Sequence, residues 1–172
     1  MNAAAVLDSA EGLELYLHQA IPLSRAMRVR VIAISDERAV LSAPLEPNIN
    51  HRGTVFGGSA GTLATLAAWS LLHSRLQRRL PASSLVLQSS SIDYLRPMCS
   101  DFRAQAELAP GADWELFQRT LERRGRARIA AIAQLWAVEQ AAARFSGEFV
   151  ALLDVPSRSG ADRVIALPRP QL

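Results

Sequence analysis

Residues 57–78 read GGSAGTLATLAAWSLLHSRLQR, and this stretch decides the fold. It contains no Pro, Asp or Glu, and none of these follows before Pro81. Leucines interleaved with alanines around Trp69 predict an α-helix about 30 Å long that is apolar on almost every side. A helix of this kind must be enclosed by other parts of the chain.

Strands are predicted on both sides of this helix, because apolar and polar residues alternate there. Two strands precede the helix and four follow it, at about 27–33, 38–45, 84–95, 101–109, 125–138 and 143–153. This order differs from the strand and helix alternation that builds a parallel sheet. The sequence therefore predicts an α+β fold, in which a curved antiparallel sheet wraps around one long central helix.

Two shorter helices complete the predicted fold. Residues 11–20 form one, which ends at Ile21 because Pro22 disfavours a helical conformation in the residue before it. The other is amphipathic and ends at Gly125; its apolar residues recur at helical spacing, at Trp114, Phe117 and Leu121.

Length and composition favour one globular domain. With 172 residues, 49% hydrophobic and 20% charged, the chain has the size of a single domain and is too apolar to be mainly disordered. We place this domain at residues 1–153. Residues 154–172 are rich in Pro and Ser, which predicts an extended or disordered tail. The uncharged run 53–74 holds too many Gly, Ser and Thr residues for a membrane span.

The net charge of +3 does not indicate nucleic-acid binding. All 19 basic residues are Arg, they are spread along the chain, and stacking aromatic residues do not interleave with them. One cluster stands out, at Arg119, Arg123, Arg124, Arg126 and Arg128. It is either a solvated helix end and strand start, or a landing site for phosphates, which Arg grips through two hydrogen bonds.

Cysteine and histidine are too few for a disulfide framework or a metal site. Cys99 is the single cysteine, and no secretory signal precedes the domain, so a reducing cytoplasm is the expected location. Three scattered His residues and one Cys give no ligand spacing. We therefore expect no metal and no redox cofactor.

The segment Gly57–Gly61 matches the G-x-S-x-G pattern of serine hydrolases, but its context argues against that chemistry. The pattern requires a His later in the chain, and the one candidate, His73, lies on the same helix about 21 Å from Ser59. Ser59 is therefore not expected to be a nucleophile.

Three segments carry a resemblance to a known family: NINHRGTVFGGS at 48–59, LATLAAW at 63–69 and SIDYLRP at 91–97. Here the chain resembles the hotdog-fold thioesterases, most closely the thioesterase domain found at the C-terminus of YiiD-type acetyltransferases. The likeness covers about residues 25–153. It implies a hotdog fold with its central helix at 57–78, hydrolysis of acyl thioesters such as acyl-CoA, and no cofactor beyond the coenzyme A of the substrate. It also implies a homodimer whose two protomers share their sites. Two such dimers could pair to form a tetramer.

The start of the central helix is the expected catalytic site. Gly57 and Gly58 let an acyl carbonyl approach the backbone, where free N–H groups stabilise the negative charge that develops on its oxygen. Alternatively, the two glycines only permit close packing of helix and sheet. In the resembling segment, Asn48, Phe56 and Ser59 are expected to contact the substrate.

The sequence leaves the group that activates water open. Many hotdog thioesterases carry an Asp or Glu two turns into the helix, where this chain has Thr65. Asp93 could act across a dimer interface, or it could instead form a salt bridge with Arg96 or Arg103 at the end of its strand. In the entry loop, Asn50 could position water and His51 could act as base or donor.

The missing helix carboxylate also keeps a second function open. The chain could be a noncatalytic module that binds acyl-CoA or an acyl-carrier protein, or a structural dimerisation domain. For either acyl-CoA function, Arg124, Arg126 and Arg128 are the expected contacts for the phosphates of coenzyme A.

Overall fold

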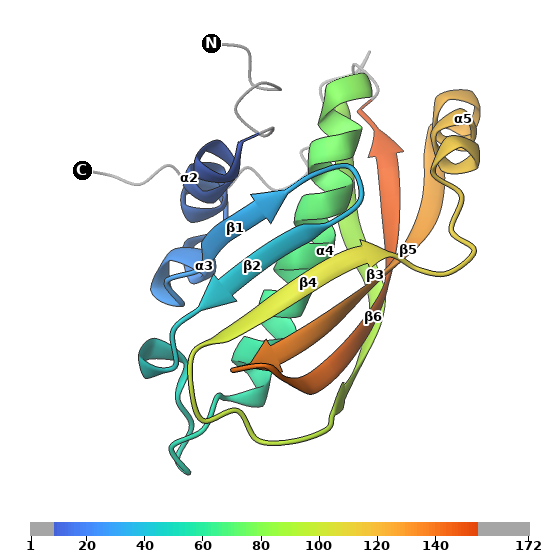
Figure 1. Ribbon diagram of the computed structural model, residues 1–172. Helices are drawn as coiled ribbons and strands as arrows, with labels where there is room; N and C mark the ends of the chain where they lie inside the picture. The colour runs from blue at the N-terminus through green and yellow to red at the C-terminus, as the bar shows by residue number, and fades with distance from the viewer. Residues whose placement is uncertain (1–8, 155–172) are drawn as a thin grey trace.

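The computed structural model describes residues 9–154, in which a six-stranded antiparallel sheet curves around helix α4, Gly57–Arg79 (Figure 1). The strands lie in the order β1-β2-β4-β5-β6-β3. Their bounds are β1 Arg30–Ile34, β2 Ala39–Ala43, β3 Ser83–Tyr94, β4 Phe102–Leu108, β5 Arg126–Ala137 and β6 Gln140–Leu153. This architecture confirms the predicted α+β fold with one long central helix.

Three short helices flank the sheet: α2 (Ala10–Ala20), α3 (Pro22–Ala26) and α5 (Trp114–Arg124), and a 3₁₀ turn covers Glu46–Asn48. Helix α2 starts where the hydroxyl of Ser9 accepts a hydrogen bond from the N–H of Gly12. Helix α5 ends at Gly125, whose φ of 68° lies in the left-handed region that favours glycine.

The prediction of a strand at 27–33 was wrong in its first residues. Pro22 ends α2 but also occupies the first position of α3, where a missing N–H costs no hydrogen bond. Met27 and Val29 are buried, as the alternation indicated, but β1 begins only at Arg30.

Strand β6 begins at Gln140, three residues before the predicted start. The chain turns within residues 138–139, where Val138 has a φ of 54°. Tight hairpins usually carry Asn or Gly at such a position, and residues 138–139 contain neither, so the turn had no signal by which to be predicted. Most of the predicted tail, 155–172, lies outside the described residues.

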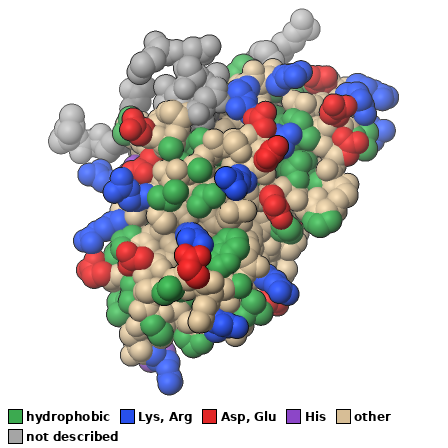
Figure 2. All heavy atoms as spheres, viewed as in Figure 1, with side chains coloured by type: hydrophobic (Ala, Val, Ile, Leu, Met, Phe, Trp, Pro, Cys, Tyr) green, Lys and Arg blue, Asp and Glu red, His purple; other side chains and the backbone are tan. Residues whose placement is uncertain are grey.

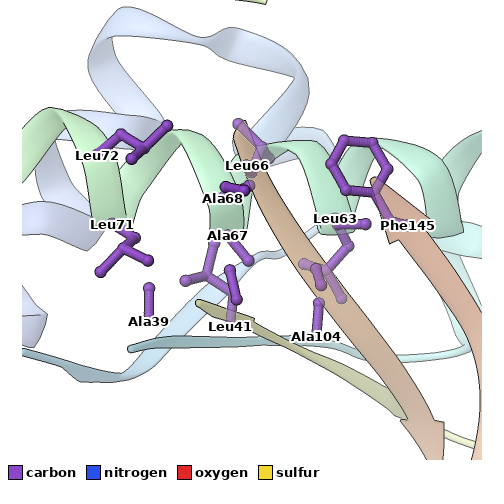
Figure 3. Close-up of a cluster of buried hydrophobic side chains, with 14 of the residues drawn as sticks. Ala39, Leu41, Leu63, Leu66, Ala67, Ala68, Leu71, Leu72, Ala104 and Phe145 are labelled. Carbon is purple, nitrogen blue, oxygen red and sulfur yellow. The ribbon is translucent and has the colours of Figure 1, made fainter. Parts of the chain in front are cut away.

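The core lies between α4 and the inner face of the sheet, the face turned toward α4. Figure 3 shows Leu63, Ala67 and Leu71 of α4 directed at small or aliphatic residues of the sheet, among them Ala39 and Leu41. Alanine at many inward strand positions lets the helix lie close to the sheet. Burial of each leucine side chain contributes about 1.5–3 kcal/mol to folding.

The outer face of the sheet, turned away from α4, carries charges of both signs. Figure 2, seen from the same side as Figure 1, shows Arg side chains interspersed with Asp and Glu side chains across this face. None of the helices described between residues 9 and 154 has the length and hydropathy needed to cross a membrane.

Candidate functional site

Helix α4 starts without a cap. Phe56 precedes the helix with an extended backbone (φ −62°, ψ 132°), and no side chain bonds to the first-turn N–H groups. The N–H of Phe56 itself donates to the carbonyl of Asn48 at 2.7 Å. The first turn also contains no acidic residue. The N–H groups of Gly57, Gly58 and Ser59 therefore form a positively polarised end that can receive an oxygen atom.

Tyr94 at the end of β3 holds the first carbonyl of α4. Its hydroxyl donates to the carbonyl oxygen of Gly57 at 2.7 Å, and a Cβ at Gly57 would lie 3.3 Å from that hydroxyl. Partial burial raises the pKa of Tyr94, so the phenol stays a donor at neutral pH. Close packing against Tyr94 thus accounts for glycine at position 57. The N–H of Gly57 takes no part in this contact. Tyr94 was missed as a site residue, although it stands in the segment SIDYLRP.

Gly58 lies beneath the ring of Phe56. A Cβ at Gly58 would overlap that ring, which is 56% exposed at the mouth of the site. Phe56 is therefore accessible to a ligand that approaches the start of α4, and its contact with substrate stays a prediction.

A groove of about 480 Å³, here called the helix groove, leads away from this helix start. It is lined by Ile21, Gly58, Gly61, Thr62, Thr65, Leu66, Trp69, Ser90, Ile92 and Phe145. Gly58 and Thr65, predicted as site residues, thus lie along one wall. The hydroxyl of Thr62 bonds to the carbonyl of Gly58 at 2.8 Å. Among the described residues, those that line the groove include no Asp, Glu or His, so its wall is largely apolar.

The entry loop is braced by its two asparagines. Asn48 is buried, and its amide donates to the carbonyls of Met27 and Pro44 at 3.0 and 2.8 Å. Its side chain therefore holds the loop, which differs from the predicted contact with substrate. By accepting the N–H of Phe56, its backbone also fixes the point where α4 begins.

Asn50 organises the turn that follows. Its Oδ1 accepts hydrogen bonds from the N–H groups of Arg52 and Thr54, and its amide donates to Thr54 Oγ1 at 2.9 Å. His51 is exposed within this turn. Neither Asn50 nor His51 lines the helix groove.

Asp93 lies on the outer face of the sheet, away from Gly58 and Thr65. It lines a separate hollow of about 540 Å³ together with residues such as Glu107, and its register partner on β6 is Arg144. The proposed salt-bridge partners of Asp93 have other contacts. Arg96 bonds Gln140 at 3.1 Å, and Arg103 bonds Glu139 at 3.2 Å.

A β-bulge in β3 explains why Asp93 faces outward. The register with β6 shifts between Leu87 and Ser89, so one residue is added to β3 and the alternation of faces is inverted. Uninterrupted alternation from Leu85 and Leu87, which face α4, would direct Asp93 inward. After the bulge, Ile92 and Tyr94 face inward instead.

The Arg cluster lies at the other end of the molecule. Arg124, Arg126 and Arg128 line a shallow hollow, and Arg126 pairs with Leu152 beside the start of β3. Arg128 Nε donates to Gln88 at 2.9 Å. The start of β3 follows the C-terminal end of α4, a helix of 23 residues that spans about 34 Å. Within one chain, the three arginines are therefore remote from Gly57.

The contacts of His73 and Ser59 argue against a serine nucleophile. Ser59 is partly buried in the first turn of α4. His73 is buried and stacks on Trp69 and Tyr16, with ring centroids 4.1 and 5.4 Å apart. Burial lowers the pKa of His73 to about 4. The two residues thus lie far apart along α4, and His73 is directed into packing contacts.

Metal-binding groups are likewise not clustered. Within residues 9–154, no three side chains of His, Cys, Asp or Glu come together in a way that could hold a metal ion.

The fold is the hotdog fold, and solved structures share it. A protein of unknown function from Chlorobaculum tepidum TLS is 25% identical, with a TM-score of 0.77 and coverage of 88% of this chain and 99% of that chain. A "putative thioesterase" from Shewanella oneidensis is 28% identical, with a TM-score of 0.72 and coverage of 83% and 96%. The model of a family described as "Putative thioesterase (yiiD_Cterm)" matches residues 10–153, and the chain therefore belongs to this thioesterase family.

Proposed function

We propose that this protein hydrolyses acyl thioesters, with acyl-CoA as substrate, at the start of helix α4. One observation carries the proposal: an uncapped helix N-terminus opens onto an apolar groove of about 480 Å³. The polar end suits the thioester oxygen and the groove suits an acyl chain. Family membership supports the same class of reaction.

The chemistry asks for stabilisation of an oxyanion. When water attacks the thioester carbonyl, negative charge develops on its oxygen, and the N–H groups of Gly57 and Gly58 can donate to it. Such preorganised donors are worth about 10² to 10³ in rate each. Collapse of the intermediate breaks the carbon–sulfur bond and releases the acid and the thiol of coenzyme A.

A second copy of the chain would complete the site. Strand β3 has twelve residues and pairs with β6 on one side, and no other strand among the described residues pairs with its second edge. This edge contains no Pro and no Lys, two residues that natural proteins use to prevent pairing. Antiparallel pairing of two β3 edges about a twofold axis would give one continuous sheet.

This dimer supports a role for the Arg cluster. In an antiparallel pair, the Ser83 end of one β3 lies beside the Tyr94 end of the other. Arg126 lies next to the first end and Gly57 next to the second. The arginines of one protomer would thus approach the helix start of its partner, where the phosphates of bound coenzyme A could reach them.

We expect the protein to sediment as a dimer at micromolar concentration, because an unpaired twelve-residue strand edge favours pairing with a second copy. Sedimentation velocity across a dilution series measures this directly. A stable folded monomer at these concentrations would contradict the shared site.

Asp93→Asn should keep kcat within about threefold of the wild type, far less than the loss of about 10² to 10⁴ expected for a general base. A continuous sheet across β3 keeps the outer faces of both protomers on the same side, so Asp93 stays away from both helix grooves. Steady-state hydrolysis of acyl-CoA measures the effect. A loss of kcat of tenfold or more would contradict this prediction and support Asp93 as the general base. His51→Ala is compared with it, because His51 is the other titratable candidate.

The proposed activity is tested by incubating the full chain with acyl-CoAs of several lengths and a reagent that reports free thiol. Release of coenzyme A supports hydrolysis. The absence of Asp, Glu and His from the described lining of the helix groove favours one rival, a noncatalytic binding module. Tight binding of acyl-CoA without any release of thiol would establish that rival.

A further inference from the structure

The helix groove is built from small residues that end at one large one. Gly58, Thr62, Thr65 and Trp69 recur every three or four residues, so they share one face of α4. The first three have small side chains, whereas Trp69 has the largest. Along α4, the lining of the groove begins at Gly58 and its last residue is Trp69.

The indole is held in place from three sides. Its Nε1–H donates to the carbonyl of Leu85 on β3 at 3.0 Å. Its ring stacks on His73, with centroids 4.1 Å apart, and on Tyr16 of α2, with centroids 6.2 Å apart. A half-buried ring with a satisfied donor and stacked faces would lose these contacts if it rotated away. Trp69 is therefore a fixed end wall.

The distance from the helix start to this wall corresponds to a chain length. Gly58 and Trp69 are eleven residues apart, which is about 16 Å along a helix axis. With carbon–carbon bonds of about 1.5 Å in a staggered zigzag, an acyl chain advances roughly 1.3 Å per carbon. The groove then accommodates a straight chain of roughly twelve carbons.

We propose that Trp69 sets the longest acyl chain that this protein accepts, and that its substrates are thioesters of medium-length straight-chain acids. This inference rests on the proposed function, because it assumes that the thioester carbonyl lies at the start of α4. Trp69 acts on specificity and takes no part in bond breaking.

The first test is the dependence of kcat/KM on acyl length for saturated acyl-CoAs from four to sixteen carbons. Each added methylene that enters the groove should raise kcat/KM about fourfold. The rise should end at roughly twelve carbons, because longer chains meet the indole. Sixteen carbons should react about tenfold more slowly than the best length. Equal rates for twelve and sixteen carbons would overturn the proposal.

The second test moves the wall. Trp69→Ala extends the groove by one helical turn, to His73, so the optimum should shift by about four carbons and the sixteen-carbon substrate should gain about tenfold. Trp69→Phe keeps an aromatic stack but has a smaller ring, so it should lengthen the optimum by about one to two carbons. Trp136→Ala, on the outer face of the sheet, is the matched control and should leave the optimum unchanged. If Trp69→Ala does not fold, Trp69→Phe decides, and an unchanged optimum in a folded variant overturns the proposal.

A binding measurement separates this inference from the proposed reaction. S-alkyl thioethers of coenzyme A with the same chain lengths cannot be hydrolysed, and calorimetry gives their Kd values. If the wild type releases no thiol but its Kd shows the same optimum, shifted in the Trp69 variants, hydrolysis is refuted and the length limit stands. If Kd shows no optimum and hydrolysis shows none, the length limit is refuted.

Discussion

Gly57→Pro should lower kcat for acyl-CoA hydrolysis by about 10² to 10³, the cost of removing one donor from an oxyanion site. Proline suits this position, because Gly57 is the first residue of α4 and its N–H has no partner within the helix. Phe56 already has the extended backbone that the residue before a proline adopts. The substitution therefore removes the N–H and leaves the helix intact.

Gly57→Ala is the matched control for this substitution. Alanine and proline both add a Cβ, which would lie 3.3 Å from the hydroxyl of Tyr94, but alanine retains the N–H. We expect Gly57→Ala to stay within about fivefold of the wild type, since only a small shift of an exposed tyrosine is needed. Equal losses in both variants would assign the effect to crowding of Tyr94. Full activity of Gly57→Pro would exclude the Gly57 N–H as a donor.

The stability of the protein should fall in mild acid because of His73. Burial holds the pKa of His73 at about 4 in the folded chain, below its ordinary value of 6.5. Above pH 6.5 the ring is neutral in both states and the full stability is present. Between pH 6.5 and 4 only the unfolded chain binds the proton, so the free energy of unfolding decreases, by about 3 kcal/mol in total.

Urea unfolding at several pH values between 7 and 4 measures this loss. His73→Phe keeps a stacking ring without a titrating group, so its stability should decline less over the same range, and the difference between the two curves isolates His73. His51→Gln, at an exposed position, should follow the wild type. Parallel curves for wild type and His73→Phe would contradict the assignment.

Much of the fold could be predicted because its signals are local. The long run without Pro, Asp or Glu marks α4, and alternation marks the strands on each side. The wrongly predicted strand boundaries, at the starts of β1 and β6, follow a residue that belongs to two helix ends or a turn that lacks its usual residues. Pro22 both ends α2 and begins α3, and Val138 occupies a turn in which Asn or Gly is usual.

The candidate site was predictable where it depends on spacing along one helix. Gly58 and Thr65 lie on the same face of α4, as their separation of seven residues requires. The face on which Asp93 lies could not be predicted in the same way, because it depends on a bulge that has no sequence signature. Asn48 also matched the family segment, yet burial assigns its side chain to the loop.

The bulge at Gln88 has a consequence for how such a site changes during evolution. This single added residue determines which face of the sheet each later residue of β3 occupies. A one-codon deletion there would move the residues that line the groove to the outer face, and those of the outer face into the groove. Asp93 would then be presented toward α4 and Tyr94 away from it. A point substitution changes one side chain at a time, whereas gain or loss of this residue reverses the orientation of about half the side chains of β3 in one step.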